Sequence, residues 1–341
     1  MLKPDMLKPG KLKRAGAIVT MAMLPMAGQA LAEYPERSIH GTIPWGAGGA
    51  TDNVARALAP HIEEQLGTDL VLTNRPGGTG VIGMHHVMRK RPDGYNILFA
   101  ADNAQLYQVL GLADFDYDAM QTINIIGQNL AVIATSPDSE FDDFAELMAY
   151  AEQHPGELRM GGTGSGGLPS TVHAMINAVD ELEVRMVTFG GDGPGITALL
   201  GGHIDFMPLS LAAAKEYINS GKLKGLAVVD TAESQAVPGV PPITEAIPTI
   251  ETYLPWGSFW GVWVPESTPD DIQATLSEAV SAAVASEGFQ EFLVDYGAMS
   301  LNLTGDEAQA YLDKWQSVTT WAMQAAGATQ QSPEAFGIPK P

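Results

Sequence analysis

The chain has no cysteine among its 341 residues. This absence excludes disulfides, thiol catalysis and metal centres built on cysteine. Basic residues are also few, with 18 Lys and Arg against 40 Asp and Glu and a formal net charge of −22. A surface of that sign repels nucleic acid and anionic lipid, so neither is expected as a partner. A chain of this length buries enough apolar surface to fold without disulfides.

Long hydrophobic runs are scarce as well. After residue 32, no stretch of the sequence reaches the roughly 18 apolar residues that a membrane-spanning helix needs. Residues 1–32 have a basic start, a short apolar run at 15–24 and small residues, Ala30 and Ala32, where a signal peptidase reads the chain. We therefore predict a signal peptide over 1–32, cleaved after Ala32, which leaves a secreted chain with a net charge of about −26.

Short strand-like runs alternate with helical stretches in the rest of the chain. Strands at 38–44, 70–73 and 96–100, with helices at 51–66 and 81–89 between them, predict a parallel sheet with right-handed crossovers. The pattern then restarts with predicted strands at 130–134, 159–161, 185–188, 203–207 and 226–229. A strand at 259–264 and three helical stretches over 269–326 complete it.

Two such units predict an α/β fold with two lobes. Lobe 1 comprises 33–134 plus 259–341, and lobe 2 comprises 135–258. The chain crosses between them near 130–135 and again near 257–261. Two crossings make a hinge, and a hinge between two lobes creates a cleft.

Three glycine-rich loops, at 44–52, 161–170 and 189–195, each join a predicted strand to a helix. Glycine lets the backbone approach a ligand closely. A helix N-terminus offers free N–H groups and a partial positive charge, so a loop of this kind binds anions without Lys or Arg. Such loops lie at the carboxyl ends of strands, where α/β proteins bind ligands. An acidic protein can therefore still bind a carboxylate.

Other chemistries fit the motifs less well. Gly46-Ala47-Gly48 begins a dinucleotide fingerprint, but Thr51 replaces its third glycine; Arg75 after the second strand keeps that alternative open. Ser165 lacks the full G-x-S-x-G context of a hydrolase, although His173 follows it. His61 and His85-His86 lack the spacing of metal ligands, so no metal and no cofactor are expected.

Short motifs in a fixed order resemble a known family, the solute-binding components of tripartite tricarboxylate transporters, also called Bug proteins. The matching segments are 34–37, 44–52, 74–80, 92–95, 155–158, 190–194, 199–205, 260–261 with Pro265, 296–297 and Trp321. The resemblance implies a type II periplasmic-binding-protein fold that closes over a small carboxylate. It also implies a periplasmic monomer without catalytic activity that delivers its ligand to integral-membrane transporter subunits. A binding protein that feeds a sensor kinase is the alternative.

Carried over by position, the resemblance implies a set of ligand-binding residues. From the three loops these are Trp45, Gly48, Gly49, Ala50, Thr51, Asp52, Thr163, Gly164, Ser165, Gly190 and Asp192. Trp45 is interpreted as a pocket wall, with packing as the alternative. Asp52 is interpreted as the N-cap of the first long helix, as an acceptor for a bridging water or ligand, or as both. The third loop lacks the cation usual in the family, which argues against a tricarboxylate in particular.

Overall fold

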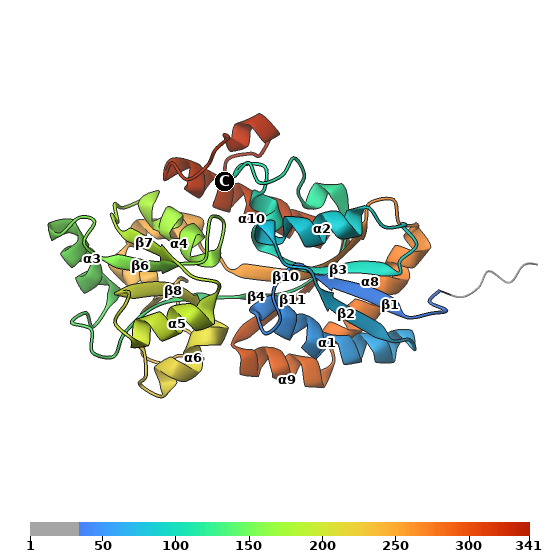
Figure 1. Ribbon diagram of the computed structural model, residues 1–341, viewed down its shortest axis with the longest axis horizontal. Coiled ribbons are helices and arrows are strands. Elements are labelled where there is room, and N and C mark those ends of the chain that lie inside the picture. The colour runs from blue at the N-terminus through green and yellow to red at the C-terminus, as the bar shows by residue number, and fades with distance from the viewer. Residues whose placement is uncertain (1–33) are drawn as a thin grey trace, which may run out of the picture. The chain divides into compact units, whose positions relative to one another are not determined.

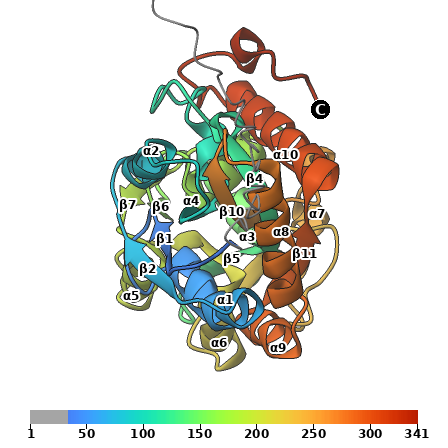
Figure 2. The same ribbon diagram turned by 90° about the vertical axis from the view of Figure 1, so that its right-hand side faces the viewer.

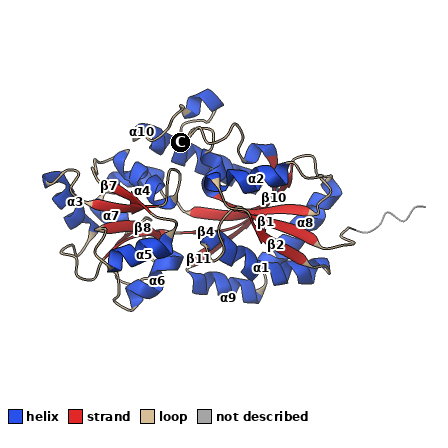
Figure 3. Ribbon diagram, viewed as in Figure 1, coloured by secondary structure: helices blue, strands red, loops and turns tan. Residues whose placement is uncertain are grey.

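Two β-sheets organise residues 34–341, which are the residues that the computed structural model describes (Figures 1 and 3). The predicted leader and its cleavage site at Ala32 lie outside the described residues. Residues 34–341 form one compact unit. Within this range, no helix is both long and apolar enough to cross a bilayer.

The first sheet has the strand order β11-β4-β10-β3-β1-β2. Its strands are β1 (Ile39–Ile43), β2 (Leu70–Asn74), β3 (Asn96–Ala101), β4 (Met120–Asn129), β10 (Ser258–Pro265) and β11 (Ala298–Leu303). β1 runs parallel to β2 and β3, which confirms the parallel unit predicted for the start of the chain. β10 pairs antiparallel with β3 and β4, and β11 pairs antiparallel with β4, so the sheet as a whole is mixed.

The second sheet has the order β7-β6-β8-β5-β9. Its strands are β5 (Ala131–Thr135), β6 (Arg159–Gly162), β7 (Arg185–Thr188), β8 (Phe206–Ser210) and β9 (Lys224–Val228). β6 is parallel to β7 and β8, whereas β5 is antiparallel to β8 and β9. The prediction of a strand at 203–207 was wrong by three residues, since β8 begins at Phe206. Asp205, directly before it, accepts hydrogen bonds from the Arg159 guanidinium.

Helices cover both faces of the sheets. They are α1 (Ala50–Leu66), α2 (Val81–Met88), α3 (Phe144–Gln153), α4 (Leu168–Asn177), α5 (Asp192–Leu200), α6 (Leu211–Asn219), α7 (Ile243–Ala246), α8 (Asp270–Val284), α9 (Glu287–Tyr296) and α10 (Gly305–Ala325). α1 ends where Gly67 adopts a left-handed φ of 65° and donates its N–H to Glu63 O. On the first sheet, α2 and α10 lie on one side, and α1 and α9 on the other (Figure 2).

One hydrophobic core is shared by the two sheets. It contains Leu98 and Ile125 from the first sheet and Phe206 and Leu226 from the second, with Leu312 of α10. Two further cores are local. One lies between the first sheet and α1, α8 and α9, and the other between the second sheet and α5 and α6. The shared core therefore joins the two sheets through apolar packing.

The chain passes from the first sheet to the second at Leu130 and returns through the segment before β10. α10 holds this returning segment in place. The Trp315 indole N–H donates to Gly257 O at 2.8 Å, and the Trp256 indole N–H donates to Thr319 Oγ1 at 3.0 Å. The two indole rings stack with centroids 6.0 Å apart. Division into two lobes at the predicted boundaries stays a prediction, and β5 lies in the second sheet.

Replacing the Trp315 indole tests how far α10 fixes the returning segment. Trp315→Phe removes the donor to the buried Gly257 carbonyl and leaves that oxygen unpaired, so we expect a loss of about 1–3 kcal/mol in the free energy of unfolding. Urea unfolding measures this loss. Trp321→Phe is the matched control on the same helix, because its indole bonds Ile338 O from a half-buried position. Equal losses in both variants would contradict a special role for Trp315.

Candidate functional site

The first glycine loop lies at the edge of the first sheet where its parallel strands end. It follows β1 and runs into α1 through Gly46, Ala47, Gly48 and Gly49, all of which are exposed. Gly49 is the N-cap of α1, and it provides no side chain to cap the helix. The N–H groups of the first turn lack carbonyl partners in any α-helix. At this end of α1 they stay free of a capping side chain.

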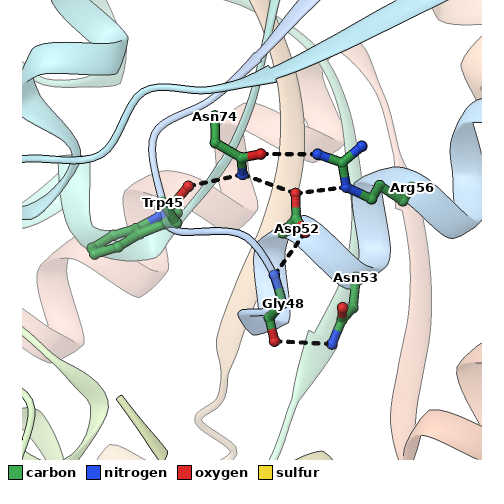
Figure 4. Close-up of polar contacts among 6 residues, drawn as sticks. All are labelled: Trp45, Gly48, Asp52, Asn53, Arg56 and Asn74. Atoms are coloured by element: carbon green, nitrogen blue, oxygen red, sulfur yellow. Dashed lines mark hydrogen bonds and ion pairs between the residues drawn. The ribbon is translucent and has the colours of Figure 1, made fainter. Parts of the chain in front are cut away.

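Asp52 fixes the conformation of this loop from beneath (Figure 4). Its side chain is only 4% exposed. Oδ2 accepts the Gly48 N–H at 2.8 Å, which bends the loop back over the helix end. Oδ1 accepts Arg56 Nε at 2.9 Å and Asn74 Nδ2 at 2.8 Å. All three donors belong to the protein, so the Asp52 carboxylate is engaged without any ligand.

These contacts correct the N-cap interpretation of Asp52. Asp52 is the third residue of α1, three positions after the N-cap Gly49, and its side chain reaches back to Gly48. Burial raises the pKa of Asp52, but the hydrogen bonds from Arg56, Gly48 and Asn74 outweigh burial and leave the pKa below its ordinary value. The group is therefore a carboxylate at neutral pH, and its charge serves to hold the loop.

Arg56 and Asn74 are site residues that the sequence analysis did not identify. Asn74, at the end of β2, donates to both Asp52 and Trp45 O, and it accepts Arg56 Nη2 at 2.8 Å. The four-residue spacing of Asp52 and Arg56 on one helix was the available signal. Asn74 occupies the end of the second strand, where a dinucleotide enzyme places an acid. It faces Asp52, and the neighbouring Arg75 is exposed.

Trp45 is part of the first loop, and its carbonyl oxygen accepts Asn74 Nδ2 from the segment 74–80. Its ring is half-buried and is turned away from the Asp52 carboxylate (Figure 4). A Cβ on Gly80 would lie 3.7 Å from the Trp45 ring and 2.7 Å from the Tyr107 hydroxyl. Gly80 also has a φ of 95°, so glycine is required there by both space and conformation. Trp45 thus packs closely on one side, and its role as a pocket wall stays a prediction.

The second loop is held by the end of β3. Asn103, in the short helix Asp102–Leu106 that follows β3, donates to Gly166 O at 2.7 Å. Gly167 is the N-cap of α4, again without a capping side chain. Ser170 Oγ donates to Gly164 O at 2.7 Å, and Gly164 has a φ of 98°. Because β1 and β3 are parallel neighbours, the first and second loops approach the same edge of the sheet.

The third loop ends at Gly191, which caps α5 with a φ of 148° and no side chain. Asp192 is the first residue of α5 and is half-buried. Burial raises its pKa to about 6, and hydrogen bonds from Ser210 offset this only in part. Burial also raises the pKa of Tyr296; the hydrogen bond from Asn53 lowers it, and the Asp192 charge adds to the rise. Asn53 Nδ2 lies 3.5 Å from the Tyr296 hydroxyl, which connects α1 to this region.

The predicted ligand-binding residues therefore lie on the three loops at strand ends, but they differ in the chemical groups that they expose. Thr51 and Asp52 have buried side chains, so these positions offer mainly main-chain N–H groups. Ser165 is exposed, whereas Thr163 is half-buried and its hydroxyl lies close to Gly167. Gly190 has open space around its Cα, since a Cβ added there would meet no atom within 4 Å.

Two of the histidines, His173 and His61, make packing contacts away from the glycine loops. His173 Nε2 lies 2.9 Å from Leu182 O and 2.8 Å from Asn177 Nδ2. His61 Nδ1 lies 3.1 Å from Ser286 Oγ, and its ring packs edge-on against Phe289. Over residues 34–341, no group of three or more His, Asp and Glu side chains is arranged to hold a metal ion.

Neutralising Asp52 tests whether its charge holds the first loop. Because its folded pKa lies below the unfolded value of about 3.9, its stabilisation is present above that value and is lost as pH falls through the folded pKa. Asp52→Asn places an amide NH₂ among donors, so we expect a loss of about 1–3 kcal/mol at neutral pH and a weaker acid dependence. Urea titrations across the acid range measure both effects.

Glu64→Gln is the matched control for that experiment, because it removes one negative charge from the exposed face of the same helix. We expect it to change the free energy of unfolding by less than about 0.5 kcal/mol. A similar loss in both variants would show that net charge, and not the Asp52 contacts, sets the stability.

Comparisons with known proteins agree with this architecture. The chain is 27% identical to Protein BugT of Bordetella pertussis over 293 residues, covering 85% of this chain and 88% of that protein. The solved periplasmic binding protein BugD superposes with a TM-score of 0.76 at 28% identity, covering 87% of this chain and all of BugD. A Rhodopseudomonas palustris protein solved with adipate superposes at 0.78 with 23% identity, covering 86% of this chain and 99% of that chain, and shows the same fold.

These structures confirm the predicted periplasmic-binding-protein fold. The family described as tripartite tricarboxylate transporter family receptor matches residues 54–317, which is most of the chain. The chain belongs to the tripartite tricarboxylate transporter receptor family.

Proposed function

We propose that this protein is a periplasmic solute-binding protein that captures a small carboxylate between its two α/β units and delivers it to an integral-membrane transporter. Family membership supports the class of function. The observation that carries the ligand class is the glycine N-cap of α1. Gly49 leaves the first-turn N–H groups without a capping side chain. They lie at the sheet edge to which Asn103, after the neighbouring strand β3, ties the second loop.

The proposed ligand contacts come from main chain and small hydroxyls. The first-turn N–H groups of Ala50, Thr51 and Asp52 receive one carboxylate, which lies against the backbone of Gly48 and Gly49. Thr163, Gly164 and Ser165 of the second loop contact it from the opposite side. Gly190 and Asp192 contact the other end of the ligand, and Trp45 forms part of the wall. Bridging waters serve equally well between such donors and a carboxylate. Closure of the protein over the ligand excludes water and lowers the local dielectric constant. Each of these contacts then has a larger interaction energy than it would have in water.

A helix with a free N-terminus also explains how an acidic protein binds an acid. The partial positive charge at the end of α1 is local, whereas the net charge is spread over the surface and screened beyond about 10 Å. Arg56 does not supply the attraction, since its guanidinium is engaged by Asp52 and Asn74. Attraction of the ligand therefore depends on the orientation of the backbone.

A thermal-shift screen of the chain from Glu33 onward tests the proposal. The panel contains mono-, di- and tricarboxylates, including adipate, together with dinucleotides. A ligand that binds only the folded state raises the midpoint as its concentration exceeds Kd. A shift with carboxylates supports the proposal. A shift with a dinucleotide alone, or silence across every carboxylate, would overturn it.

A capping side chain at position 49 provides a sharper test. Gly49 has a φ of −78° and a ψ of 170°, which serine adopts freely, although its Cβ would lie 3.3 Å from Gly46 O. In Gly49→Ser the hydroxyl competes for the first-turn N–H groups. We expect stability to change by only a few tenths of a kcal/mol, while carboxylate affinity falls at least about tenfold. Calorimetric titration and urea unfolding separate the two effects.

Thr304→Asp is the control for this substitution, because Thr304 is the N-cap of α10 and makes no side-chain capping bond. It should leave the affinity unchanged while altering the cap of another helix. Unchanged affinity in Gly49→Ser would show that the N-terminus of α1 does not hold the ligand.

A further inference from the structure

Asp102 is a buried acid at the sheet edge from which the first glycine loop emerges. It directly follows the last residue of β3 and is only 6% exposed. β1 and β3 run in parallel as far as the pair Thr42 and Leu98, so the first loop and Asp102 leave the first sheet at the same edge. The next residue, Asn103, bonds the second loop at Gly166 O. Asp102 is therefore adjacent to the residue that anchors the second loop.

The Asp102 carboxylate receives little support from hydrogen bonds. Ser258, the first residue of β10, donates its hydroxyl to Oδ1 at 3.0 Å, and this is the one side-chain hydrogen bond to Asp102 among residues 34–341. Three phenols of this region bond other oxygens: Tyr107 donates to Thr79 O, Tyr117 to Ala101 O and Tyr311 to Gln128 Oε1. Ser258 and the backbone N–H of Asp102 itself are thus the groups that favour its charged form.

Within the described part of the chain, no cation compensates the Asp102 charge. None of the ion pairs within 4.0 Å includes this residue. The short helix that Asp102 begins packs against α10, β10 and the turn 78–80. β10 and that turn contain no charged residue. The charged residues of α10 are all exposed; they are Asp306, Glu307, Asp313 and Lys314.

The titratable groups around Asp102 are phenols and one further acid. Burial raises the pKa of Tyr107, Tyr117 and Tyr311, and the Asp102 charge adds to each rise. Asp116 lies near the other end of the same short helix, where Gln316 bonds both its carboxylate and Gln105 O at 3.1 Å. None of these groups offers a positive charge, so Asp102 is a buried acid without a counter-charge.

Asp52 shows how pairing controls the ionisation of a buried acid in the same region. Burial raises its pKa, but hydrogen bonds from Arg56, Gly48 and Asn74 hold the pKa below its ordinary value. For Asp102, burial raises the pKa to about 7, and the Ser258 hydrogen bond offsets burial only in part. Near neutral pH, Asp52 is therefore charged, whereas the Asp102 carboxyl exchanges a proton with water.

A bound carboxylate changes this balance at Asp102. The ligand brings a second negative charge to the same edge of the sheet, and like charges favour the protonated form of an acid. Exclusion of water around the ligand strengthens that repulsion. A group whose pKa rises on binding takes up a proton as the ligand binds.

We propose that Asp102 takes up a proton from the solvent when the protein binds its carboxylate ligand, so that ligand affinity increases as the pH falls. This inference depends on the proposed carboxylate-binding function and specifies how pH regulates that same site. Protonation leaves the ligand unchanged and removes one of two like charges from the sheet edge. Acidic conditions therefore favour loading of the protein, and alkaline conditions favour release.

The pH dependence of ligand affinity tests the inference. The mono-, di- and tricarboxylates of the thermal-shift panel, adipate among them, are titrated calorimetrically into the purified protein between about pH 6.5 and about pH 9, where such acids are largely ionised. We expect the wild type to bind at least about threefold more tightly at the lower pH. In Asp102→Asn, which takes up no proton, this ratio should fall to near unity. Titration of the ligand or of Asp192 is common to both proteins and cancels in the comparison.

Proton uptake gives a readout that needs no variant. Titrations of the wild type at about pH 7.5, in buffers with different heats of ionisation, count the protons taken up for each ligand bound. We expect about 0.3–0.8 proton for the wild type and near zero for Asp102→Asn.

Ser258→Ala shifts the effect without removing the acid. Loss of the hydroxyl removes a hydrogen bond that favours the charged carboxylate, so the pKa of Asp102 rises. The pH range over which the affinity changes should therefore move to higher pH. A merely structural contact would alter stability and leave this range unchanged.

Asp114→Asn is the matched control, because it removes one exposed negative charge from the segment between the short helix and β4. It should keep the wild-type pH dependence, and thermal midpoints report the folding of each variant. Carboxylate binding without proton uptake in the wild type, or equal pH dependence in wild type and Asp102→Asn, would overturn the inference while leaving the carboxylate function intact. Failure of every carboxylate to bind the folded wild type at any of these pH values would instead overturn the proposed function.

Discussion

The candidate site depends on one buried carboxylate. Asp52 receives hydrogen bonds from Gly48, Arg56 and Asn74, and these partners come from the loop after β1, from α1 and from the end of β2. A buried charge is tolerated only when it is well paired, so the three segments must keep one arrangement. These contacts around Asp52 thereby fix the conformation of the exposed backbone of the first loop. Its own sequence, rich in glycine, would otherwise leave it free to adopt many conformations.

The second and third loops are tied to the same region by fewer contacts. Asn103 connects the end of β3 to Gly166, and Tyr296 connects Asn53 with the surroundings of Asp192. Between the sheets, the core around Leu312 and Trp315 and the Trp315 bond to Gly257 O fix the segment that returns to the first sheet. The packing contacts that fix the fold therefore come from the buried core, whereas the loops carry the polar groups of the candidate site.

Sequence patterns predicted the parts of this structure that local rules control. The β1–α1–β2–α2–β3 unit follows from alternating periodicity and from Gly67 as a helix stop, and the three glycine loops lie at strand ends as expected. β4 and β11 were not predicted, because β4 contains buried Asn124 and Asn129 among its apolar residues and β11 is a half-exposed edge strand. The Asp52–Asn74 contact joins residues far apart in the chain, and no local pattern reveals such a pairing.

The N–H groups at the start of α1 belong to the main chain, and among the common substitutions only proline removes such a group. Alanine scanning of the first loop therefore misses the groups that matter most, since Gly48 and Gly49 have no side chain to remove. A relative at 28% identity has the same fold. If this loop binds the ligand as proposed, the substitutions that impair binding are those that change the loop's backbone conformation, such as substitutions at Asp52 and Asn74.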